Sequence, residues 1–338
     1  RMSAVDTRIK SALFYDYPPG DGDVFGQGRR DRIAKLTDLY PHVITGGNFD
    51  SHADNLTDVE VIFATWGIPS FSEHHFSSMP KLKAVFYAAG NVKSFAPAVI
   101  ERGIVLVGAW DINAIPVAEM CLSQILLSLR GYFRATRRYS ELQTGDAKIF
   151  PRSGVFGETV GLIGLGKIGT RLRNLLVDYP IKVIAHDPFL TETRARELDV
   201  ESVSLEEIFE RSLVVSNHIP DIESTVGALN GSHFEVMRDG ATFVNSGRGA
   251  QVVEADLIRV LTARPDLTAL LDVTLPEPPE PGSALWTLPN VIISPHVGGT
   301  IGDEVVRLTD CVIEQFENWS SGVPLEYQIT KEVLATMG

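Results

Sequence analysis

The feature that most constrains the fold of this chain is a glycine motif placed between an apolar strand and a helix. Residues 159–169 read TVGLIGLGKIG, so an apolar segment leads into Gly164-x-Gly166-x-x-Gly169. In such a motif the first glycine permits a tight turn, the second lets a pyrophosphate approach the backbone, and the third lets the helix lie close to the strand. The N–H groups that begin the helix then face the phosphates. The motif predicts a dinucleotide-binding βαβ unit with these cofactor-binding residues: Gly164, Gly166, Lys167, Ile168 and Gly169.

An acidic residue follows this motif at a suitable distance. Asp187 ends the next expected strand, about twenty residues beyond the glycines. A carboxylate there accepts hydrogen bonds from ribose hydroxyls and repels a 2′-phosphate, so Asp187 favours NAD over NADP. A glycine turn without a ligand is the alternative, and the strand, the helix and Asp187 together argue against it.

Short apolar runs alternate with helical patterns along most of the chain, which is typical of α/β proteins with parallel sheets. The first third predicts helices at 30–39 and 95–102 and strands at 12–15, 59–65, 83–88 and 105–108. A long helix is expected at about 115–141, with Pro116 in its first turn, followed by a loop at 143–157. Six further strands are expected at 159–163, 182–186, 213–217, 242–245, 268–273 and 291–294.

This order of elements predicts two doubly wound, parallel-sheet α/β domains. The six later strands match a Rossmann dinucleotide-binding domain, which we place at residues 113–301. The last helix, at about 303–319, comes too late to belong to that sheet. We therefore expect it to pack on the first domain, which would then be discontinuous, with residues 1–112 and 302–338.

Composition argues against several function classes. The 338 residues carry a formal net charge of −13, which is unlike the basic footprint of nucleic-acid binders or of polybasic membrane contacts. Two cysteines, Cys121 and Cys311, make neither a disulfide framework nor a four-cysteine zinc site, and they fit a reducing cytoplasm. We expect no metal site. We expect no signal peptide, because residues 1–10 lack an apolar core. We expect no membrane-spanning helix, because no run of about 18 apolar residues occurs.

Three further motifs follow expected strands, and ligands of open α/β sheets bind at the carboxyl ends of strands. Arg248 stands between Gly247 and Gly249, and its guanidinium can grip a carboxylate through two hydrogen bonds. A structural ion pair is the alternative for this arginine. His296, followed by Val-Gly-Gly, suits proton transfer in alcohol–ketone chemistry near neutral pH, and a loop-anchoring histidine is its alternative. Glu277 is the candidate carboxylate that would fix the tautomer of His296 and favour its protonated form, and a solvated loop carboxylate is its alternative.

Together these motifs resemble the D-isomer-specific 2-hydroxyacid dehydrogenase family over nearly the whole chain. The resemblance rests on residues 164–169 with Asp187, 217–220 with Thr225, 243–249, 271–278 and 285–296. It implies a catalytic set of Arg248, Glu277 and His296, and a flavodoxin-like substrate domain in which the backbone of Ala89 and Gly90 holds the substrate carboxylate. It also implies further cofactor-binding residues: His218, Pro220, Thr225, Asn245, Ser246, Asp272, Gly298 and Gly299.

The family resemblance implies NAD-dependent hydride transfer to or from C2 of a 2-oxo or 2-hydroxy acid, as in phosphoglycerate dehydrogenases and glyoxylate or hydroxypyruvate reductases. Departures from the family pattern at Val92, Thr274 and Ser294 lie outside the catalytic set and leave the substrate open. Trp66 and Trp110 either shape the substrate pocket or are core aromatics.

Two alternatives remain. The formate-oxidising branch pairs its histidine with a glutamine, so Glu277 counts against it. A non-catalytic, NAD-sensing protein similar to transcriptional corepressors keeps the same residues, although the chain shows no basic segments. The resemblance and the dense apolar face of residues 115–129 predict a homodimer, and we expect it in the cytoplasm.

Overall fold

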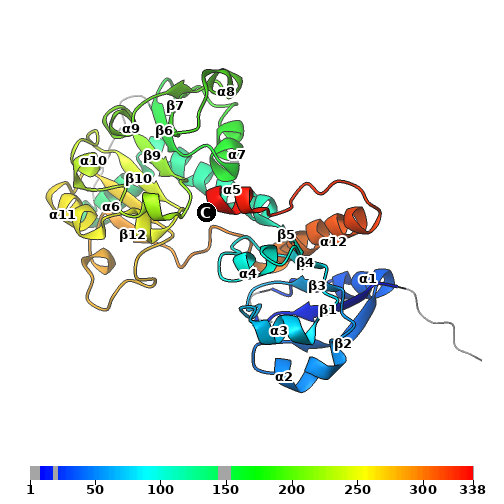
Figure 1. The fold of residues 1–338 in the computed structure, drawn as a ribbon. Coiled ribbons are helices and arrows are strands. Elements are labelled where there is room, and N and C mark those ends of the chain that lie inside the picture. The colour runs from blue at the N-terminus through cyan, green and yellow to red at the C-terminus, as the bar shows by residue number, and fades with distance from the viewer. Residues whose placement is uncertain (1–7, 18–21, 144–153, 338) are drawn as a thin grey trace, which may run out of the picture. The chain divides into compact units, whose positions relative to one another are not determined.

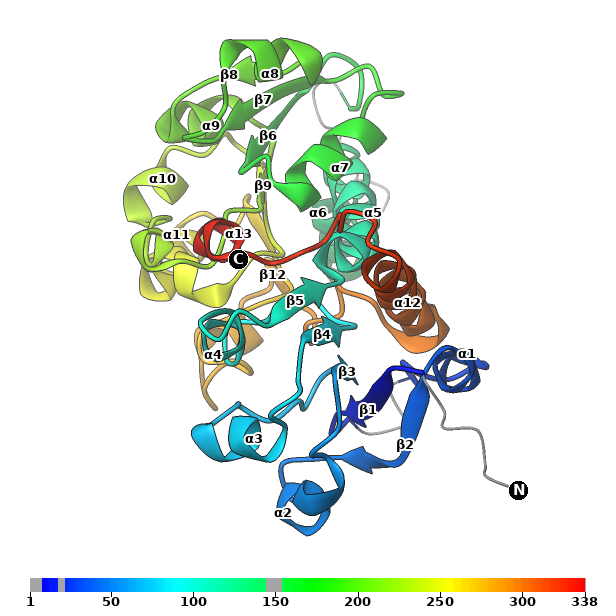
Figure 2. The same cartoon turned by 45° about the vertical axis from the view of Figure 1, so that its right-hand side comes forward.

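Both sheets of the chain are entirely parallel, and each belongs to a separate unit (Figures 1 and 2). The computed structural model describes residues 8–17, 22–143 and 154–337. Unit 1 comprises Arg1–Asn113 and Thr300–Thr336, and unit 2 comprises Ala114–Gly299 with Met337–Gly338. The expected two-sheet α/β fold is thereby confirmed.

Unit 1 holds a five-stranded sheet in the order β2-β1-β3-β4-β5, which is the flavodoxin-like doubly wound order. Its strands are β1 (Lys10–Phe14), β2 (Asp38–Ile44), β3 (Val61–Ala64), β4 (Ala84–Tyr87) and β5 (Val105–Gly108). Its helices are α1 (Arg29–Leu36), α2 (Phe49–His52), α3 (Glu73–Ser78), α4 (Ala96–Ile100), α12 (Val306–Ser320) and α13 (Lys331–Thr336).

Strand β2 was not predicted from the sequence. It contains Asp38, Pro41 and His42 and has no apolar run, because it is an edge strand whose side chains are mostly partly or fully exposed. A proline is tolerated at an edge, where no neighbouring strand needs its missing N–H.

The late helix α12 packs on β4 and β5 within unit 1, as predicted. Phe316 lies with its ring 5.2 Å from that of Phe63 and 5.6 Å from that of Phe86. Arg29 of α1 donates to Asp310 of α12 at 2.7 Å. These contacts join segments that are more than 200 residues apart in the sequence, so unit 1 is discontinuous.

Unit 2 holds a seven-stranded sheet in the order β12-β11-β10-β9-β6-β7-β8. Its strands are β6 (Thr159–Ile163), β7 (Lys182–His186), β8 (Glu201–Ser202), β9 (Val214–Asn217), β10 (Thr242–Asn245), β11 (Thr268–Leu271) and β12 (Val291–Ile293). This is the Rossmann order with one added strand. All six predicted strands are present, and only the two-residue strand β8, which has no apolar run, was missed.

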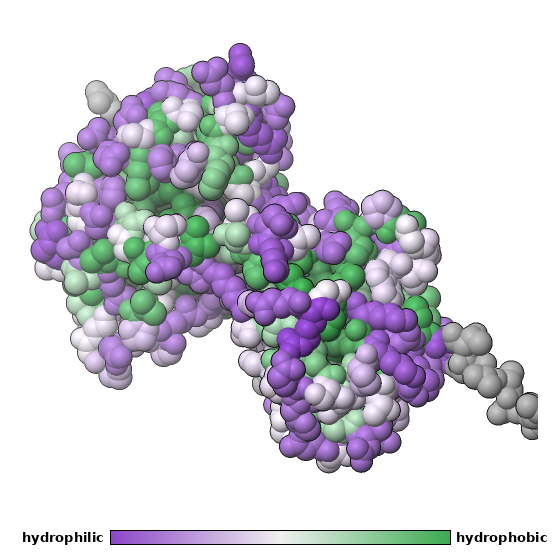
Figure 3. Space-filling model, viewed as in Figure 1, coloured by the Kyte–Doolittle hydropathy of each residue, from purple (hydrophilic) through white to green (hydrophobic). Residues whose placement is uncertain are grey.

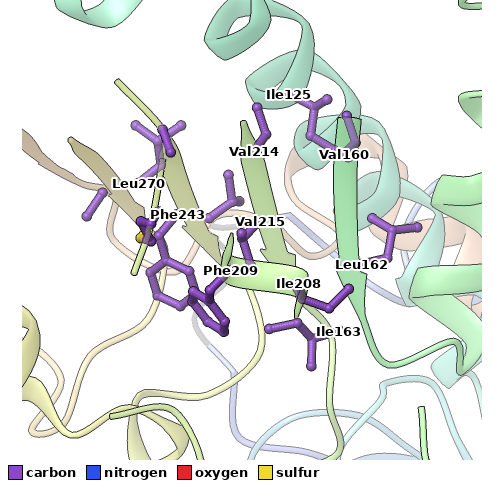
Figure 4. Close-up of a cluster of buried hydrophobic side chains, with 14 of the residues drawn as sticks. Ile125, Val160, Leu162, Ile163, Ile208, Phe209, Val214, Val215, Phe243 and Leu270 are labelled. Carbon is purple, nitrogen blue, oxygen red and sulfur yellow. The ribbon is translucent and has the colours of Figure 1, made fainter. Parts of the chain in front are cut away.

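The helices of unit 2 cover both faces of this sheet, so its central strands are buried and read as apolar runs. They are α6 (Tyr132–Leu142), α7 (Lys167–Leu175), α8 (Glu192–Glu197), α9 (Leu205–Arg211), α10 (Gly231–Glu235) and α11 (Glu254–Ala263), together with most of α5 (Trp110–Leu129). Figure 4 shows Phe209 of α9 beside Phe243 of β10, with their ring centroids 6.2 Å apart.

The prediction of a single long helix at 115–141 is wrong. The chain forms α5 and α6, which are separated at Gly131, where φ is +65°. A left-handed residue cannot continue a right-handed helix, and glycine adopts that conformation at little cost. Helix α5 also begins earlier than expected, so Pro116 lies inside it and not in its first turn. Of the loop expected at 143–157, residues 144–153 lie outside the described part of the chain.

Within the described residues, α5 is the one helix that is long and apolar enough to cross a membrane, with a mean hydropathy of 1.5. Its apolar face is part of the core of unit 2, where Ala118, Cys121, Ile125 and Leu129 are fully buried. The face that suggested a dimer is therefore covered in part by the chain itself, and the homodimer stays a prediction. Figure 3 shows hydrophilic and hydrophobic residues interspersed on the face in view, with hydrophobic patches on both units.

Candidate active site

Six strands of unit 2 end in one row across the sheet. Their registers place these last residues side by side: His186, Ile163, Asn217, Asn245, Leu271 and Ile293. The next residue of each segment opens a loop at the same edge, and these residues are Asp187, Gly164, His218, Ser246, Asp272 and Ser294. The motifs found in the sequence therefore begin at one edge of one sheet, where such sheets bind ligands.

The glycine loop has the geometry that a pyrophosphate needs. Gly164 has φ +87°, and a Cβ there would lie 2.7 Å from the His218 carbonyl oxygen. A Cβ on Gly169 would lie 2.0 Å from the Gly164 carbonyl oxygen, so only glycine lets α7 pack this closely. By contrast, a Cβ on Gly166 would meet nothing within 4 Å, and no side chain caps α7 there. The open space at Gly166 and the uncapped start of α7 fit a dinucleotide phosphate.

Asp187 has a second role that the sequence did not indicate. One carboxylate oxygen accepts the Leu165 N–H at 2.7 Å and the other accepts the Phe189 N–H at 2.8 Å. The side chain is partly buried and holds the glycine loop to the end of β7. Since a carboxylate offers about four acceptor sites, it can still accept bonds from ribose hydroxyls.

His218 belongs to a small buried polar cluster. One ring nitrogen lies 2.8 Å from the Ser216 hydroxyl and the other lies 3.5 Å from the Ser246 hydroxyl. Burial lowers the pKa of His218 to about 4. Ser246 also contacts the thiol of Cys121 at 3.2 Å, and burial raises the pKa of that thiol to about 11. Near neutral pH both groups are therefore uncharged.

The loop after His218 is stabilised by hydrogen bonds between the Thr225 side chain and the loop backbone. The Thr225 hydroxyl lies 2.7 Å from the Pro220 carbonyl oxygen and accepts the Ile222 N–H at 3.2 Å. In the structure Thr225 thus shapes this loop, and its contact with a cofactor stays a prediction.

The Arg248 loop is held through its backbone. The Arg248 N–H donates to the Gln251 amide oxygen at 3.0 Å, and the Arg248 carbonyl accepts from the Asn245 side chain at 3.3 Å. The guanidinium is partly exposed and, among the residues that the structure describes, donates one bond, to the Gly247 carbonyl at 2.8 Å. Most of its five N–H donors therefore remain for another group. The side chains of Asn217 and Gln251, which sequence reasoning assigned no role, complete this arrangement.

Glu277 and His296 are in direct contact, as expected. The Glu277 carboxylate lies 2.6 Å from Nδ1 of His296, and both side chains are partly exposed. This contact directs Nδ1 to the carboxylate and leaves Nε2 for another partner. Arg248 makes no hydrogen bond to either residue in the described structure. Its loop does touch theirs, since a Cβ on Gly249 would lie 2.0 Å from the Thr274 backbone.

Asp272 holds the loop that carries His296. Its carboxylate is 3% exposed and accepts bonds from the Ser294 hydroxyl at 2.6 Å, the Val297 N–H at 2.9 Å and the Gly298 N–H at 2.8 Å. These bonds bracket His296, whose own φ is +53°. Gly298 is needed for the close approach, because a Cβ there would lie 2.8 Å from the Asp272 carboxylate. Gly299 follows directly in the same loop.

Ala89 and Gly90 lie in unit 1, directly after β4. The Ala89 N–H donates to the Tyr87 carbonyl at 2.9 Å, and a Cβ on Gly90 would approach the Asn113 side chain at 3.4 Å. Their role toward a substrate stays a prediction. In the same unit, Trp66 lies 5.0 Å from the ring of Tyr17, and Trp110 lies 5.9 Å from that of Tyr327.

Among the described residues no group of three or more histidine, cysteine, aspartate or glutamate side chains could hold a metal ion. The described site therefore consists of the glycine loop, the Asp272 loop, the Glu277–His296 pair and Arg248. This set suits a dinucleotide, a carboxylate and a proton that is exchanged at Nε2 of His296.

Comparison with known proteins gives the same assignment. The family model described as D-isomer specific 2-hydroxyacid dehydrogenase, NAD binding domain, matches residues 122–298. The chain is 30% identical over 270 residues to D-3-phosphoglycerate dehydrogenase of Archaeoglobus fulgidus, which covers 76% of this chain and 51% of that protein. It is also 30% identical over 273 residues to YoaD of Bacillus subtilis, a protein assigned by name to the 2-hydroxyacid dehydrogenases, with 78% of each chain covered.

Solved structures share the fold. A phosphoglycerate oxidoreductase from Rhizobium etli superposes with a TM-score of 0.79 at 22% identity, covering 97% of this chain and 99% of that one. D-mandelate dehydrogenase from Rhodotorula graminis gives 0.78 at 21% identity, with 96% and 98% covered.

The chain spans about half the length of the phosphoglycerate dehydrogenase of Archaeoglobus fulgidus. The matched region is the NAD-binding domain of its family, and the open glycine loop fits that cofactor, so NAD is the cofactor of unit 2. With the family model matching 122–298 and YoaD matching over 78% of its length, this chain belongs to the D-isomer specific 2-hydroxyacid dehydrogenase family.

Proposed function

We propose that this protein is an NAD-dependent oxidoreductase that interconverts a small, unphosphorylated 2-oxo acid and its 2-hydroxy acid. The observation that carries the proposal is the 2.6 Å contact between Glu277 and His296, at the sheet edge that also bears Arg248 and the glycine loop. NAD, when bound, supplies or accepts the hydride at C2 of the substrate.

Arg248 binds the substrate carboxylate in this proposal. Within the described structure its guanidinium makes one hydrogen bond, to the Gly247 carbonyl, and its planar fork matches a carboxylate through two parallel bonds. The same cation also polarises the C2 oxygen as negative charge develops there.

His296 exchanges the proton. Since Nδ1 faces Glu277, Nε2 is the nitrogen that donates a proton to the C2 oxygen on reduction and removes it on oxidation. The Glu277 carboxylate stabilises the imidazolium, and Asp272 fixes the backbone on the C-terminal side of His296. One hydride at C2 and one proton at oxygen complete the reduction.

The charges in unit 1 favour an unphosphorylated substrate. Five connections follow its strands, at residues 15–28, 45–48, 65–72, 88–95 and 109. In the described residues of these connections Lys93 is the one lysine or arginine, whereas carboxylates occur at Asp16 and Asp23. A phosphate is bound most readily by several cations. The phosphoglycerate dehydrogenase activity in the names of the relatives therefore does not transfer directly to this chain.

The first test is turnover of NADH with glyoxylate, hydroxypyruvate, phosphohydroxypyruvate and larger 2-oxo acids, together with formate and NAD. We expect reduction of at least one unphosphorylated 2-oxo acid with a kcat/KM above that of phosphohydroxypyruvate. A preference for phosphohydroxypyruvate would contradict the substrate class. NADH binding without any turnover would favour the alternative of an NAD-sensing protein. Oxidation of formate with NAD would favour the alternative of a formate-oxidising enzyme.

A second prediction concerns Arg248. Arg248→Ala should reduce kcat/KM for the 2-oxo acid by at least ~3 kcal/mol, more than a hundredfold, because both the grip and the polarisation are lost. The loop should persist, since its bonds to Gln251 and Asn245 use the Arg248 backbone. Arg248→Lys keeps the charge without the fork and should recover only part of the rate. Steady-state kinetics beside NADH titration by fluorescence measure both effects, and loss of NADH binding would move Arg248 to the cofactor site.

A third prediction concerns pH. Glu277→Gln keeps the shape but removes the negative charge beside His296, so the imidazolium loses its stabilising partner. Reduction needs the protonated form, and therefore the alkaline limb of its pH profile should move to lower pH while activity at acidic pH survives better. Glu280→Gln, in the same exposed loop, is the matched control and should leave the profile unchanged. A uniform loss of rate with no movement of the limb would indicate a purely structural role for Glu277.

A fourth prediction concerns the choice of cofactor. The negative charge of Asp187 should give NADH a higher kcat/KM than NADPH, because it repels a 2′-phosphate. Asp187→Ser should narrow this ratio by about 1–3 kcal/mol, the range of a hydrogen bond to a charged group. Affinity for NADH should also fall, because serine cannot hold both Leu165 and Phe189 N–H groups. An NADPH preference in the unmodified protein would overturn this reasoning.

A further inference from the structure

Gln251 is a buried polar residue that the proposed reaction does not use. It ends the short helical turn Gly249–Gln251 in the Arg248 loop, and it is 0% exposed. Its amide oxygen accepts the Asn217 side chain at 2.7 Å and the Arg248 N–H at 3.0 Å. Its amide nitrogen donates to the carbonyls of Ile219 at 2.8 Å and Pro220 at 3.1 Å. All of the two acceptor and two donor positions of a glutamine amide are thus occupied.

Asn217 is the partner of Gln251 and is also fully buried. Its side-chain nitrogen donates to Gln251 and, at 3.0 Å, to the Asn245 amide oxygen, so both of its hydrogens are used. Its own oxygen accepts the Ile219 N–H at 3.3 Å. Asn217 ends β9 and Asn245 ends β10, so the amides connect two neighbouring strand ends to the loop that carries Arg248.

This network is more than the filling of a core. A buried amide is costly unless all its bonds are made, and a leucine of similar size would fill the space without that requirement. Within the described structure, besides Asn217, the Gln251 side chain binds backbone groups only: it donates to the carbonyls of Ile219 and Pro220 and accepts the Arg248 N–H. The loop is also fitted closely to the network, because a Cβ on Gly247 would lie 2.5 Å from the Gln251 amide oxygen.

We propose that Gln251 and Asn217 are positioning residues that fix the backbone of Arg248 in the orientation that receives the substrate carboxylate. The inference rests on the proposed function, because it requires Arg248 to bind that carboxylate. Gln251 holds the Arg248 N–H and the side chain of Asn245 holds the Arg248 carbonyl, so the residue is fixed on both sides. Both holders are joined through Asn217. A site geometry of this kind tolerates errors of only about 0.5 Å, so a loosened backbone would misplace the guanidinium.

The decisive variant is Gln251→Leu, which keeps the volume and removes all four bonds. We expect kcat/KM for glyoxylate or hydroxypyruvate, whichever is turned over faster, to fall about tenfold or more, mainly through KM. Asn217→Leu should act in the same direction. In the Arg248→Ala background Gln251→Leu should add little, because no guanidinium remains to be positioned.

Asn290→Leu is the matched control. Asn290 is also a buried amide of unit 2 and donates to the carbonyls of Leu261 and Arg264, but it precedes β12 and so lies at the opposite edge of the sheet. We expect the midpoint of thermal unfolding of the Asn290→Leu variant to fall, while its KM for the 2-oxo acid stays unchanged. If Gln251→Leu lowers the midpoint but leaves KM unchanged, like the control, the positioning role is wrong.

Gln251→Glu gives an independent readout if the leucine variant fails to fold. A protonated carboxyl can replace the oxygen acceptor and one donor, whereas an ionised one would face the carbonyls of Ile219 and Pro220. Activity relative to the parent should therefore recover as the pH falls, and a flat ratio would contradict the proposal. Should Arg248→Ala itself retain turnover, the proposed function fails; a strong Arg248 effect with a normal Gln251→Leu variant overturns only this inference.

Discussion

The structure of the site depends on one constraint, the shared register of parallel strands in unit 2. Because the strands run in one direction and end in one row, the chain must place the residues after Ile163, Asn217, Asn245 and Leu271 at one edge. Gly164 and His296 thus belong to loops of the same edge, although more than 130 residues separate them in the sequence. The crossover helices bury both faces of the sheet and leave this edge as the place for chemistry.

Loops at such an edge need to be held, and here acidic and amide side chains hold them by accepting backbone N–H groups. Asp187 holds the glycine loop, Asp272 holds the His296 loop, and Gln251 holds the Arg248 loop. These residues were read from the sequence as ligand contacts or not read at all. Their hydrogen bonds show that these side chains hold the backbone of the glycine loop and of the loops that carry His296 and Arg248.

Sequence reasoning succeeded where a local pattern has one physical cause. Buried parallel strands read as apolar runs, so β6 and β7 were predicted with their observed bounds. The polar edge strands β2 and β8 lack that signal, and the break at Gly131 depends on a left-handed conformation that a glycine permits without requiring. The hydrogen bond between Asn217 and Gln251 joins residues 34 positions apart, and the sequence around either residue carries no pattern that predicts this bond.

Burial decides which histidine of this edge can exchange protons. His218 and His296 both follow sheet strands, but His218 is enclosed beside two serine hydroxyls, and burial lowers its pKa to about 4. It is therefore neutral at physiological pH and can only orient neighbours by hydrogen bonds. His296 lies on a partly exposed loop, and the Glu277 carboxylate is 2.6 Å from its Nδ1. Of the two histidines, the accessible His296 is therefore the one to which the proposed function assigns the proton exchange, and a contact of His218 with the cofactor stays a prediction.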